Sequence, residues 1–160
     1  SKRSWRLPKK WHPPNTRGGA MAGSIKLEIV TPEKIVVSED AQIVMAPGVL
    51  GEFGVLVGHT PFLTALKAGA VRYTDAQGAE HLVFVSGGFA EALPDRVTIL
   101  AESAERRRDI DVERARAALE RAQKRLAEQR SKEELDFVRA QAALQRALMR
   151  LRIIENHPTH

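Results

Sequence analysis

The sequence predicts an α+β protein in which an antiparallel β-sandwich of about ten strands is followed by an α-helical hairpin. Residues 25–100 contain many short β-branched runs separated by glycine, proline and aspartate, and none of the intervening segments is long enough for a crossover helix. Residues 109–155 instead repeat their apolar positions every three or four residues, as amphipathic helices do. We therefore expect a leader over residues 1–20, a sandwich domain over residues 21–103 and a hairpin domain over residues 104–160.

Residues 1–20 have the composition of a disordered segment. They carry six Lys and Arg and no acidic residue, and Pro8, Pro13 and Pro14 prevent the few apolar residues from building a core. Met21 stands directly before the first periodic segment, where a natural start would lie. We expect a basic expression leader or an upstream-translated extension. A transit peptide is the alternative that the arginines favour and the prolines disfavour.

The β segment can be followed strand by strand. Alternating apolar and polar residues predict a strand over 25–30, after which Thr31–Lys34 turns the chain. Runs at 35–37 and 42–45 predict two more strands before a glycine-punctuated region over 48–58. Two hairpins follow, each predicted by β runs on both sides of a turn. They comprise residues 70–74 and 81–85 around Asp75–Gly78, and residues 89–93 and 97–100 around Pro94 and Asp95.

Each helix of the predicted hairpin has one apolar seam. The seams are Val112, Ala115, Leu119, Ala122 and Leu126 on the first helix, and Phe137, Ala140, Leu144, Ala147, Leu151 and Ile154 on the second. Asp109 and Asp111 are N-cap candidates for the first helix, and Ser131–Glu134 spells a capping box for the second. Because four of these eleven seam residues are alanine, the hairpin buries little area, so we expect it to dock on another surface or to be able to leave it.

The net charge of +5 suggests a nucleic-acid-binding protein until its distribution is considered. Residues 1–20 contribute +6. Residues 21–100 hold five basic against nine acidic residues, a net of −4, and residues 101–160 hold fourteen against eleven, a net of +3. A basic nucleic-acid-binding module is therefore only the alternative function. Phe137 is the one aromatic residue available for base stacking in the two helices, and it lies on the predicted seam.

No enzyme template fits the sequence. The absence of cysteine excludes disulfides and thiol nucleophiles. The glycines of residues 48–54 match neither a dinucleotide fingerprint nor a P-loop, and Ser86 lacks the context of a hydrolase nucleophile. The histidines show no metal-ligand spacing, and His59 is expected in a turn with its imidazole bonded to nearby backbone. The uncharged stretch Phe53–Leu66 is shorter than the about 20 residues that a membrane-spanning helix needs.

Four arginines of the predicted hairpin could share one surface. They are Arg114, Arg121, Arg146 and Arg150. The first two are seven residues apart on one helix, and the last two are four apart on the other. If the turn centres near residue 130, antiparallel packing brings the four guanidiniums together, with Glu105 and Asp111 nearby. Such a cluster suits phosphate oxygens, although a solvated basic face explains the spacing as well. We expect the run Arg106–Arg108 to be solvated.

Several stretches, taken in order and with their spacing, resemble the epsilon subunits of bacterial F-type ATP synthases. They are Gly51–Pro61, Phe84–Glu91, Arg96–Ala101 and Asp109–Ala115. The resemblance extends from about Ile25 to Ile154 and departs from the family at Val57, where proline is common.

The resemblance implies a ten-stranded sandwich with a helical hairpin, in a non-catalytic rotor subunit of the central stalk of a proton-translocating ATP synthase. The sandwich would bind the gamma subunit and sit on the c-ring, with Thr31–Lys34 and Gly51–His59 as contact surfaces. The hairpin would either lie folded on the sandwich or extend along gamma towards the catalytic alpha and beta subunits and inhibit ATP hydrolysis. The protein would be peripheral on the cytoplasmic face of the bacterial inner membrane, touching the membrane only through the complex and binding no nucleic acid.

The resemblance also implies a regulatory ATP site in the folded hairpin, through a motif of the form I-D-x-x-R-A and further polar residues. The matching positions are Glu105, Ile110, Asp111, Arg114, Ala115, Arg121, Arg146 and Arg150. No catalytic residue, metal ligand or obligatory cofactor is implied.

Overall fold

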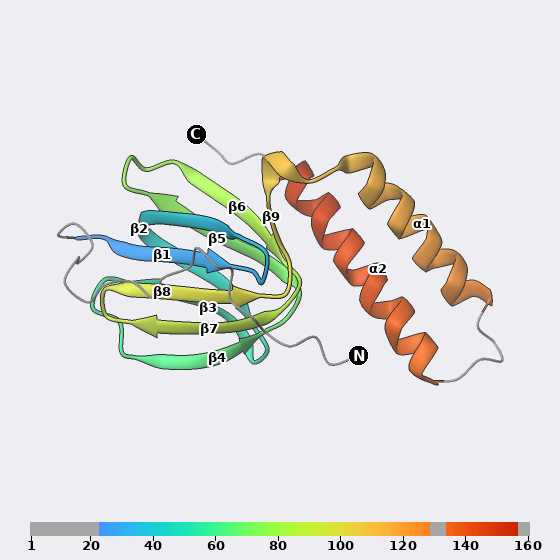
Figure 1. The fold of residues 1–160 in the computed structure, drawn as a ribbon, viewed down its shortest axis with the longest axis horizontal. Coiled ribbons are helices and arrows are strands. Elements are labelled where there is room, and N and C mark those ends of the chain that lie inside the picture. The colour runs from blue at the N-terminus through green and yellow to red at the C-terminus, as the bar shows by residue number, and fades with distance from the viewer. Residues whose placement is uncertain (1–22, 129–133, 157–160) are drawn as a thin grey trace.

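The chain folds into a β-sandwich followed by two antiparallel helices (Figure 1), which confirms the predicted fold class. The computed structural model describes residues 23–128 and 134–156, so the expectations for residues 1–20 and for the capping-box residues 131–133 lie outside the described part. The strands of this part are β1 (Ile25–Val30), β2 (Ile35–Gly48), β3 (Gly51–Leu56), β4 (Phe62–Leu66), β5 (Gly69–Asp75), β6 (Glu80–Val85), β7 (Gly88–Leu93), β8 (Arg96–Ala101) and β9 (Ala104–Arg106). A 3-10 turn (Arg107–Asp109) leads into α1 (Val112–Glu128) and α2 (Glu134–Glu155).

The strands form one hydrogen-bonded sheet in the order β1-β8-β7-β4-β2-β5-β6-β9, with β3 paired to β2. The sheet folds back on itself because β1 also pairs with β2, and this closure makes the two layers of the sandwich. Neighbouring strands run antiparallel except for β1 and β8, which are parallel. The sheet ends at Arg106, immediately before the hairpin begins.

β2 is one long strand where the sequence predicted two short ones. The polar residues Ser38, Glu39 and Asp40, which separate the two β-branched runs, remain in the strand because they pair with Glu28, Leu27 and Lys26 of β1. The second half of β2 then pairs with β3 and β5. Cross-strand pairing therefore overrides the low β propensity of these residues.

The core of the sandwich is built by strands in which buried and less buried side chains alternate. In β8, for example, Val97, Ile99 and Ala101 are buried in the core, whereas the residues between them are only half-buried. Tyr73 of β5 is the largest side chain of this core, and its hydroxyl reaches the edge of the sandwich. Alternation of this kind fixes the register of each strand, because a slip of one residue would turn its apolar side chains to solvent.

Two predicted turns are confirmed in detail. At the tip of the β5–β6 hairpin, Oδ1 of Asp75 accepts hydrogen bonds from the amides of Gln77 and Ala79, both at 2.9 Å. Gly78 in this turn has φ +85°, a conformation that favours glycine. Farther along the sandwich surface, Nδ1 of His59 lies 2.6 Å from the carbonyl oxygen of Thr60, so the imidazole bonds to local backbone as expected.

The seam between α1 and α2 is built on alanine, as predicted. Ala115 and Ala122 of α1 and Ala140 and Ala147 of α2 are buried. The prediction for Phe137 is wrong, because this side chain is 47% exposed. It lies in the first turn of α2, at the tip of the hairpin farthest from the sandwich (Figure 1), where the described chain has no third layer to cover a large ring. Neither described helix is apolar enough over a sufficient length to cross a bilayer.

The hairpin docks on one end of the sandwich through α2, which lies between α1 and the strands (Figure 1). A small apolar cluster, separate from the sandwich core, makes this contact; we call it the docking cluster. Its buried members are Leu82, Phe84, Ile110 and Ile153, with Ala70, Met149 and Ile154 packed against them. The cluster joins β5 and β6 to the connecting segment and to the last turns of α2.

Candidate functional site

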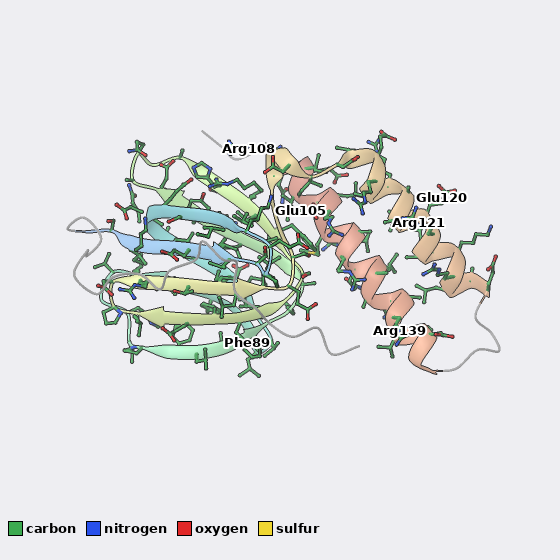
Figure 2. All side chains as sticks on the ribbon, in the orientation of Figure 1. Phe89, Glu105, Arg108, Glu120, Arg121 and Arg139 are labelled. Atoms are coloured by element: carbon green, nitrogen blue, oxygen red, sulfur yellow. The ribbon has the colours of Figure 1, made fainter. Side chains whose placement is uncertain are left out.

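A cavity of about 350 Å³ lies where the end of the sandwich meets both helices. This volume is at the small end of the range of ligand pockets. Its lining residues are Glu105, Asp109, Asp111, Arg114, Ala115, Ala118, Arg121 and Arg150. We call it the hairpin cavity. Figure 2 shows Glu105 at the junction of the sandwich and the hairpin, and Arg121 farther along α1.

Six of the eight residues that the sequence singled out line this cavity. They are Glu105, Asp111, Arg114, Ala115, Arg121 and Arg150. Ile110 lies elsewhere, because its side chain is buried in the docking cluster. Arg146 lies one turn before Arg150 on α2 and is half-buried, outside the lining. The cavity therefore draws its walls from β9, the connecting segment and both helices.

The motif Ile110–Ala115 shapes the start of α1. Oδ1 of Asp111 accepts a hydrogen bond from the amide of Arg114 at 3.0 Å, so Asp111 is the N-cap. Ile110 before it anchors the connecting segment in the docking cluster, and Ala115 after it is buried on the seam. These fixed neighbours leave Arg114, in the first turn of α1, exposed at the cavity.

Arg150 is the cavity arginine that already has a counter-ion. Its Nε and Nη2 lie 3.2 Å and 3.0 Å from Oε1 of Glu105, and its guanidinium stacks 4.2 Å from the ring centroid of Phe84. The contact with Phe84 combines a cation–π interaction with packing on the docking cluster. Arg150 therefore belongs both to the cavity and to the contact that holds the hairpin on the sandwich.

Arg114 and Arg121 are in a different electrostatic situation. Both are exposed, and within residues 23–128 and 134–156 neither guanidinium has an ion-pair or hydrogen-bond partner. With Arg150 they place three guanidiniums around a space lined by three carboxylates, one of which is paired to Arg150 and another of which caps α1. Guanidinium forks of this kind suit an anion with several oxygens, such as phosphate. Among the described residues, no group of three or more acidic and histidine side chains is arranged to hold a metal ion.

A second polar network lies at the edge of the sandwich, and sequence reasoning missed it. Arg106 of β9 donates to the carbonyl oxygen of Val36 at 3.1 Å, to the hydroxyl of Tyr73 at 3.2 Å and to Oε1 of Glu39 at 2.8 Å. Tyr73 in turn donates to Oε2 of Glu39 at 3.0 Å. The expectation that the run Arg106–Arg108 is solvated is therefore wrong for Arg106.

The pKa values of this network follow from its burial and contacts. Burial raises the pKa of Tyr73 to about 12, and the nearby carboxylate of Glu39 contributes while the charge of Arg106 opposes. Burial alone would raise the pKa of Glu39, but the hydrogen bonds from Arg106 and Tyr73 outweigh it and hold this pKa below its ordinary value. The pair stays ionised near neutral pH, and it ties β9 to β2.

Next to this network, Nε2 of His81 lies 2.8 Å from Oδ2 of Asp75, and its ring stacks on Tyr73 with centroids 4.8 Å apart. The hydrogen bond from His81 and those from the amides of the turn lower the pKa of Asp75. An imidazole and a carboxylate meet here, but their contacts stabilise the β5–β6 hairpin.

An exposed apolar patch covers the sheet at the β4–β7 side; we call it the β4–β7 patch. Leu63 and Phe89 are 71% and 54% exposed, and Val49 and Leu50 are 54% and 97% exposed. These residues are neighbours because Ala65, two residues after Leu63, pairs with Phe89, and the amide of Val49 donates to the carbonyl oxygen of Ala65 at 3.0 Å. Figure 2 shows Phe89 projecting from the sandwich near its hairpin end. A cluster of this kind is typical of a protein-docking surface.

Comparisons with known proteins cover both parts of the chain. The family described as the β-sandwich domain of the ATP synthase delta/epsilon chain matches residues 24–107, and its long α-helix domain matches residues 108–155. The ATP synthase epsilon chain of Desulfosudis oleivorans is 71% identical over 106 residues, which are 66% of this chain and 80% of the relative. That of Carboxydothermus hydrogenoformans is 51% identical over 107 residues, 67% of this chain and 79% of the relative.

Two solved structures share the fold. A chain of the mitochondrial ATP synthase of Euglena gracilis superposes with a TM-score of 0.72 at 23% identity, covering 93% of this chain and 99% of that one. A chain of the central stalk and c-ring of the Tetrahymena thermophila enzyme gives 0.53 at 11% identity, covering 81% and 96%. The sandwich and the hairpin each match in sequence, and the bacterial relatives match over most of their length. The chain therefore belongs to the delta/epsilon chain family of ATP synthases.

Proposed function

We propose that the protein is a non-catalytic rotor subunit in the central stalk of a proton-translocating ATP synthase, where it couples the c-ring to the catalytic sector through the gamma subunit. Family membership supports this role, as does the similarity in fold to a chain of a solved central stalk and c-ring. The observation on which the proposal depends most is the β4–β7 patch, because a rotor subunit needs an apolar surface by which torque passes to its neighbour.

The gamma subunit is the proposed occupant of the β4–β7 patch. The two segments that the family resemblance implies as contact surfaces reach opposite ends of the sandwich. Thr31–Lys34 follows β1 at the hairpin end, since Val30 pairs with Leu100, which pairs with Phe89. The last residues of Gly51–His59 lie at the opposite end, where the amide of Gly58 bonds to the carbonyl oxygen of Pro94. The c-ring would contact one of these segments, and the complex would hold the protein at the cytoplasmic face of the bacterial inner membrane.

Co-purification with gamma tests the docking role. Leu63→Asp and Phe89→Asp each place a charge in the centre of the patch, and we expect at least a tenfold loss of affinity for gamma, because an unpaired charge would be desolvated in the interface. Val138→Asp is the matched control, since Val138 is as exposed as Phe89 but lies on α2. If both patch variants bind gamma as tightly as wild type, gamma does not dock on the β4–β7 patch.

We also propose that the hairpin regulates the complex by inhibiting ATP hydrolysis when it leaves the sandwich and reaches the catalytic alpha and beta subunits. The small docking cluster and the alanine seam support this, because two arrangements that differ by a few kcal/mol suffice for a switch. Removing residues 107–160 from the subunit of an assembled complex should raise its ATP hydrolysis rate. An unchanged rate at every ATP concentration would contradict the inhibitory role.

Regulatory ATP is the proposed ligand of the hairpin cavity. Three guanidiniums around about 350 Å³ support phosphate binding, and Arg114 and Arg121 have no counter-ion among the described residues. Because the walls come from both the sandwich and the hairpin, the cavity exists only while the hairpin is docked. ATP would therefore favour the docked form by the difference between its affinities for the two forms.

Isothermal titration of ATP into the full chain tests the cavity. Arg121→Ala should weaken binding by roughly tenfold to a hundredfold, as expected for the loss of a charge-assisted hydrogen bond. Arg139→Ala is the control, because Arg139 is exposed on α2 near the hairpin tip, away from the cavity (Figure 2). Equal affinities of the wild type and both variants would exclude phosphate recognition by Arg121.

A further inference from the structure

Two consecutive arginines bind two different parts of the molecule. Arg106 has its three acceptors on β2 and β5, so its side chain is part of the sandwich. Nε and Nη2 of Arg107 instead donate to the carbonyl oxygens of Ile153 and Ile154, at 3.0 Å and 2.8 Å. The side-chain partners of the chain therefore change from the sandwich to the end of α2 between these two residues.

The acceptors of Arg107 are in the last turn of α2. The last four carbonyls of a helix have no partner within the helix and carry the negative end of its dipole. A guanidinium that bridges two of them satisfies both oxygens and places a positive charge where the dipole favours it. Arg107 thus caps α2 from the connecting segment, which comes 46 and 47 residues earlier in the sequence.

Among the described residues, few other contacts join the hairpin to the sandwich. The docking cluster has four buried residues, against nineteen in the core of the sandwich. Arg150 adds its ion pair with Glu105 on β9 and its contact with Phe84. With so small an apolar contact, the two hydrogen bonds of Arg107 are a large part of what keeps the end of α2 in place.

The connecting segment has the geometry of a hinge. The 3-10 turn Arg107–Asp109 is flanked by extended residues, with Arg106 at φ −63°, ψ 149° and Ile110 at φ −74°, ψ 121°. Short 3-10 turns between extended residues can absorb a change of direction over few dihedral angles. Ile110 is held by the docking cluster, so releasing the hairpin frees the chain from Arg107 onward.

We propose that Arg107 is the latch of the hairpin and Arg106 its fixed anchor, so that the hairpin swings about residues 107–111 when the bonds from Arg107 to α2 break. This rests on the proposed function only in assuming that the hairpin leaves the sandwich. The β9–β6 pairing and the Arg106–Glu39 pair stay intact in the released form, while the Arg150–Glu105 pair, the docking cluster and the hairpin cavity are lost.

Hydrogen exchange of the full chain, without ATP or partners, tests the latch directly. Arg107→Ala should raise exchange of the amides at residues 149–156 by at least about tenfold, and leave β9 and its partner β6 protected. Arg107→Lys keeps the charge but has no planar fork to bridge two carbonyls, so we expect most of the same effect. Arg108→Ala is the matched control, because Arg108 is an exposed neighbour in the same 3-10 turn.

Arg106→Ala should give the opposite pattern, with faster exchange in β9. Since the chain has no cysteine, Ser38→Cys and Gln141→Cys can carry spin labels that report the distance between sandwich and hairpin. The proposal predicts a longer distance in a larger fraction of Arg107→Ala molecules than of wild type. Unchanged protection of residues 149–156, or equal loss in β9 and α2, overturns the latch. If Arg107→Ala releases the hairpin but leaves the ATP hydrolysis rate of the complex unchanged, the latch is supported and the proposed regulation is contradicted.

Discussion

Arg106 and Glu39 are 67 residues apart in the sequence, yet Nη2 of Arg106 lies 2.8 Å from Oε1 of Glu39. The pair connects the last strand of the sandwich to the long strand β2, and Tyr73 bonds to both partners. It holds β9, and therefore the start of the hairpin, on the sandwich. A short strand of three residues has little pairing of its own, so its position depends on this side chain.

The first prediction concerns the stability that Arg106 provides. Arg106→Ala removes three hydrogen bonds and leaves the half-buried carboxylate of Glu39 without its counter-ion, which we expect to cost roughly 2–3 kcal/mol of unfolding free energy. Urea denaturation measures the change, with Arg108→Ala as the exposed control that should stay within about 0.5 kcal/mol of wild type. Equal stabilities for the two variants would show that the network does not stabilise the sandwich.

A second prediction concerns Tyr73 at high pH. Its pKa is raised from 10.0 to about 12, so between these values the folded protein holds a proton that the unfolded chain has lost. Stability from this group is complete below pH 10 and is lost as the pH rises through about 12, by roughly 2–3 kcal/mol in all. Denaturation midpoints measured from pH 9 upward should fall more steeply for wild type than for Tyr73→Phe. If the midpoints of the two proteins fall in parallel with pH, the raised pKa of Tyr73 is contradicted.

A third prediction separates close packing from backbone conformation. Gly88 has φ +132°, and a Cβ there would overlap the carbonyl oxygen of Leu100 and lie 2.9 Å from Cα of Ala101. Gly51 has almost the same φ, +135°, but open space around the position of a Cβ. Both substitutions to alanine strain the backbone, and only Gly88→Ala also pushes β7 from β8.

We therefore expect Gly88→Ala to lower the unfolding free energy by at least about 2 kcal/mol more than Gly51→Ala does. Thermal denaturation of both variants provides the comparison. A similar loss in the two proteins would mean that the strand contact at Gly88 relaxes freely.

The alanine seam gives a fourth prediction. Ala147 is fully buried between the helices, so Ala147→Leu forces α1 and α2 apart, at a cost of about 1–3 kcal/mol. Ala142 is exposed on the same helix, and Ala142→Leu should be nearly neutral because alanine and leucine have similar helix propensities. Exchange of the helix amides reports the hairpin separately from the sandwich. If the helix amides are equally protected in Ala147→Leu and Ala142→Leu, the close packing of the two helices at Ala147 is contradicted.

Local patterns in the sequence were enough to predict most of the fold and much of the hairpin cavity. Helical spacing and a turn near residue 130 brought Arg114, Arg121 and Arg150 to one place, as the structure does. Period-two alternation identified β1, which the structure places at Ile25–Val30. The faces of helices and strands are set by neighbours within a few residues, and one short turn then folds α2 back against α1.

What the sequence did not reveal depends on distant partners. Arg106 and Arg107 look like a solvated run, and only the folded chain places Glu39 and the end of α2 within their reach. Periodicity put Phe137 on the seam, but whether a seam position is covered depends on the length of the facing helix and on the layer beyond it. The polar residues inside β2 predict a break between two strands, because only the folded chain shows that β1 pairs with them.

The last prediction separates the structural and electrostatic roles of Asp111. Its Oδ1 caps α1 by accepting the amide of Arg114, and its carboxylate also lines the hairpin cavity. Asp111→Ala should cost about 1 kcal/mol of local stability and speed exchange of the amides of Arg114 and Ala115, whereas Asp111→Asn keeps a capping oxygen and should leave both amides protected. Asn also removes a negative charge beside the three cavity arginines, so inorganic phosphate should bind it no more weakly than wild type. If exchange at these amides rises equally in the two variants, the charge of Asp111, rather than its capping oxygen, holds the first turn of α1.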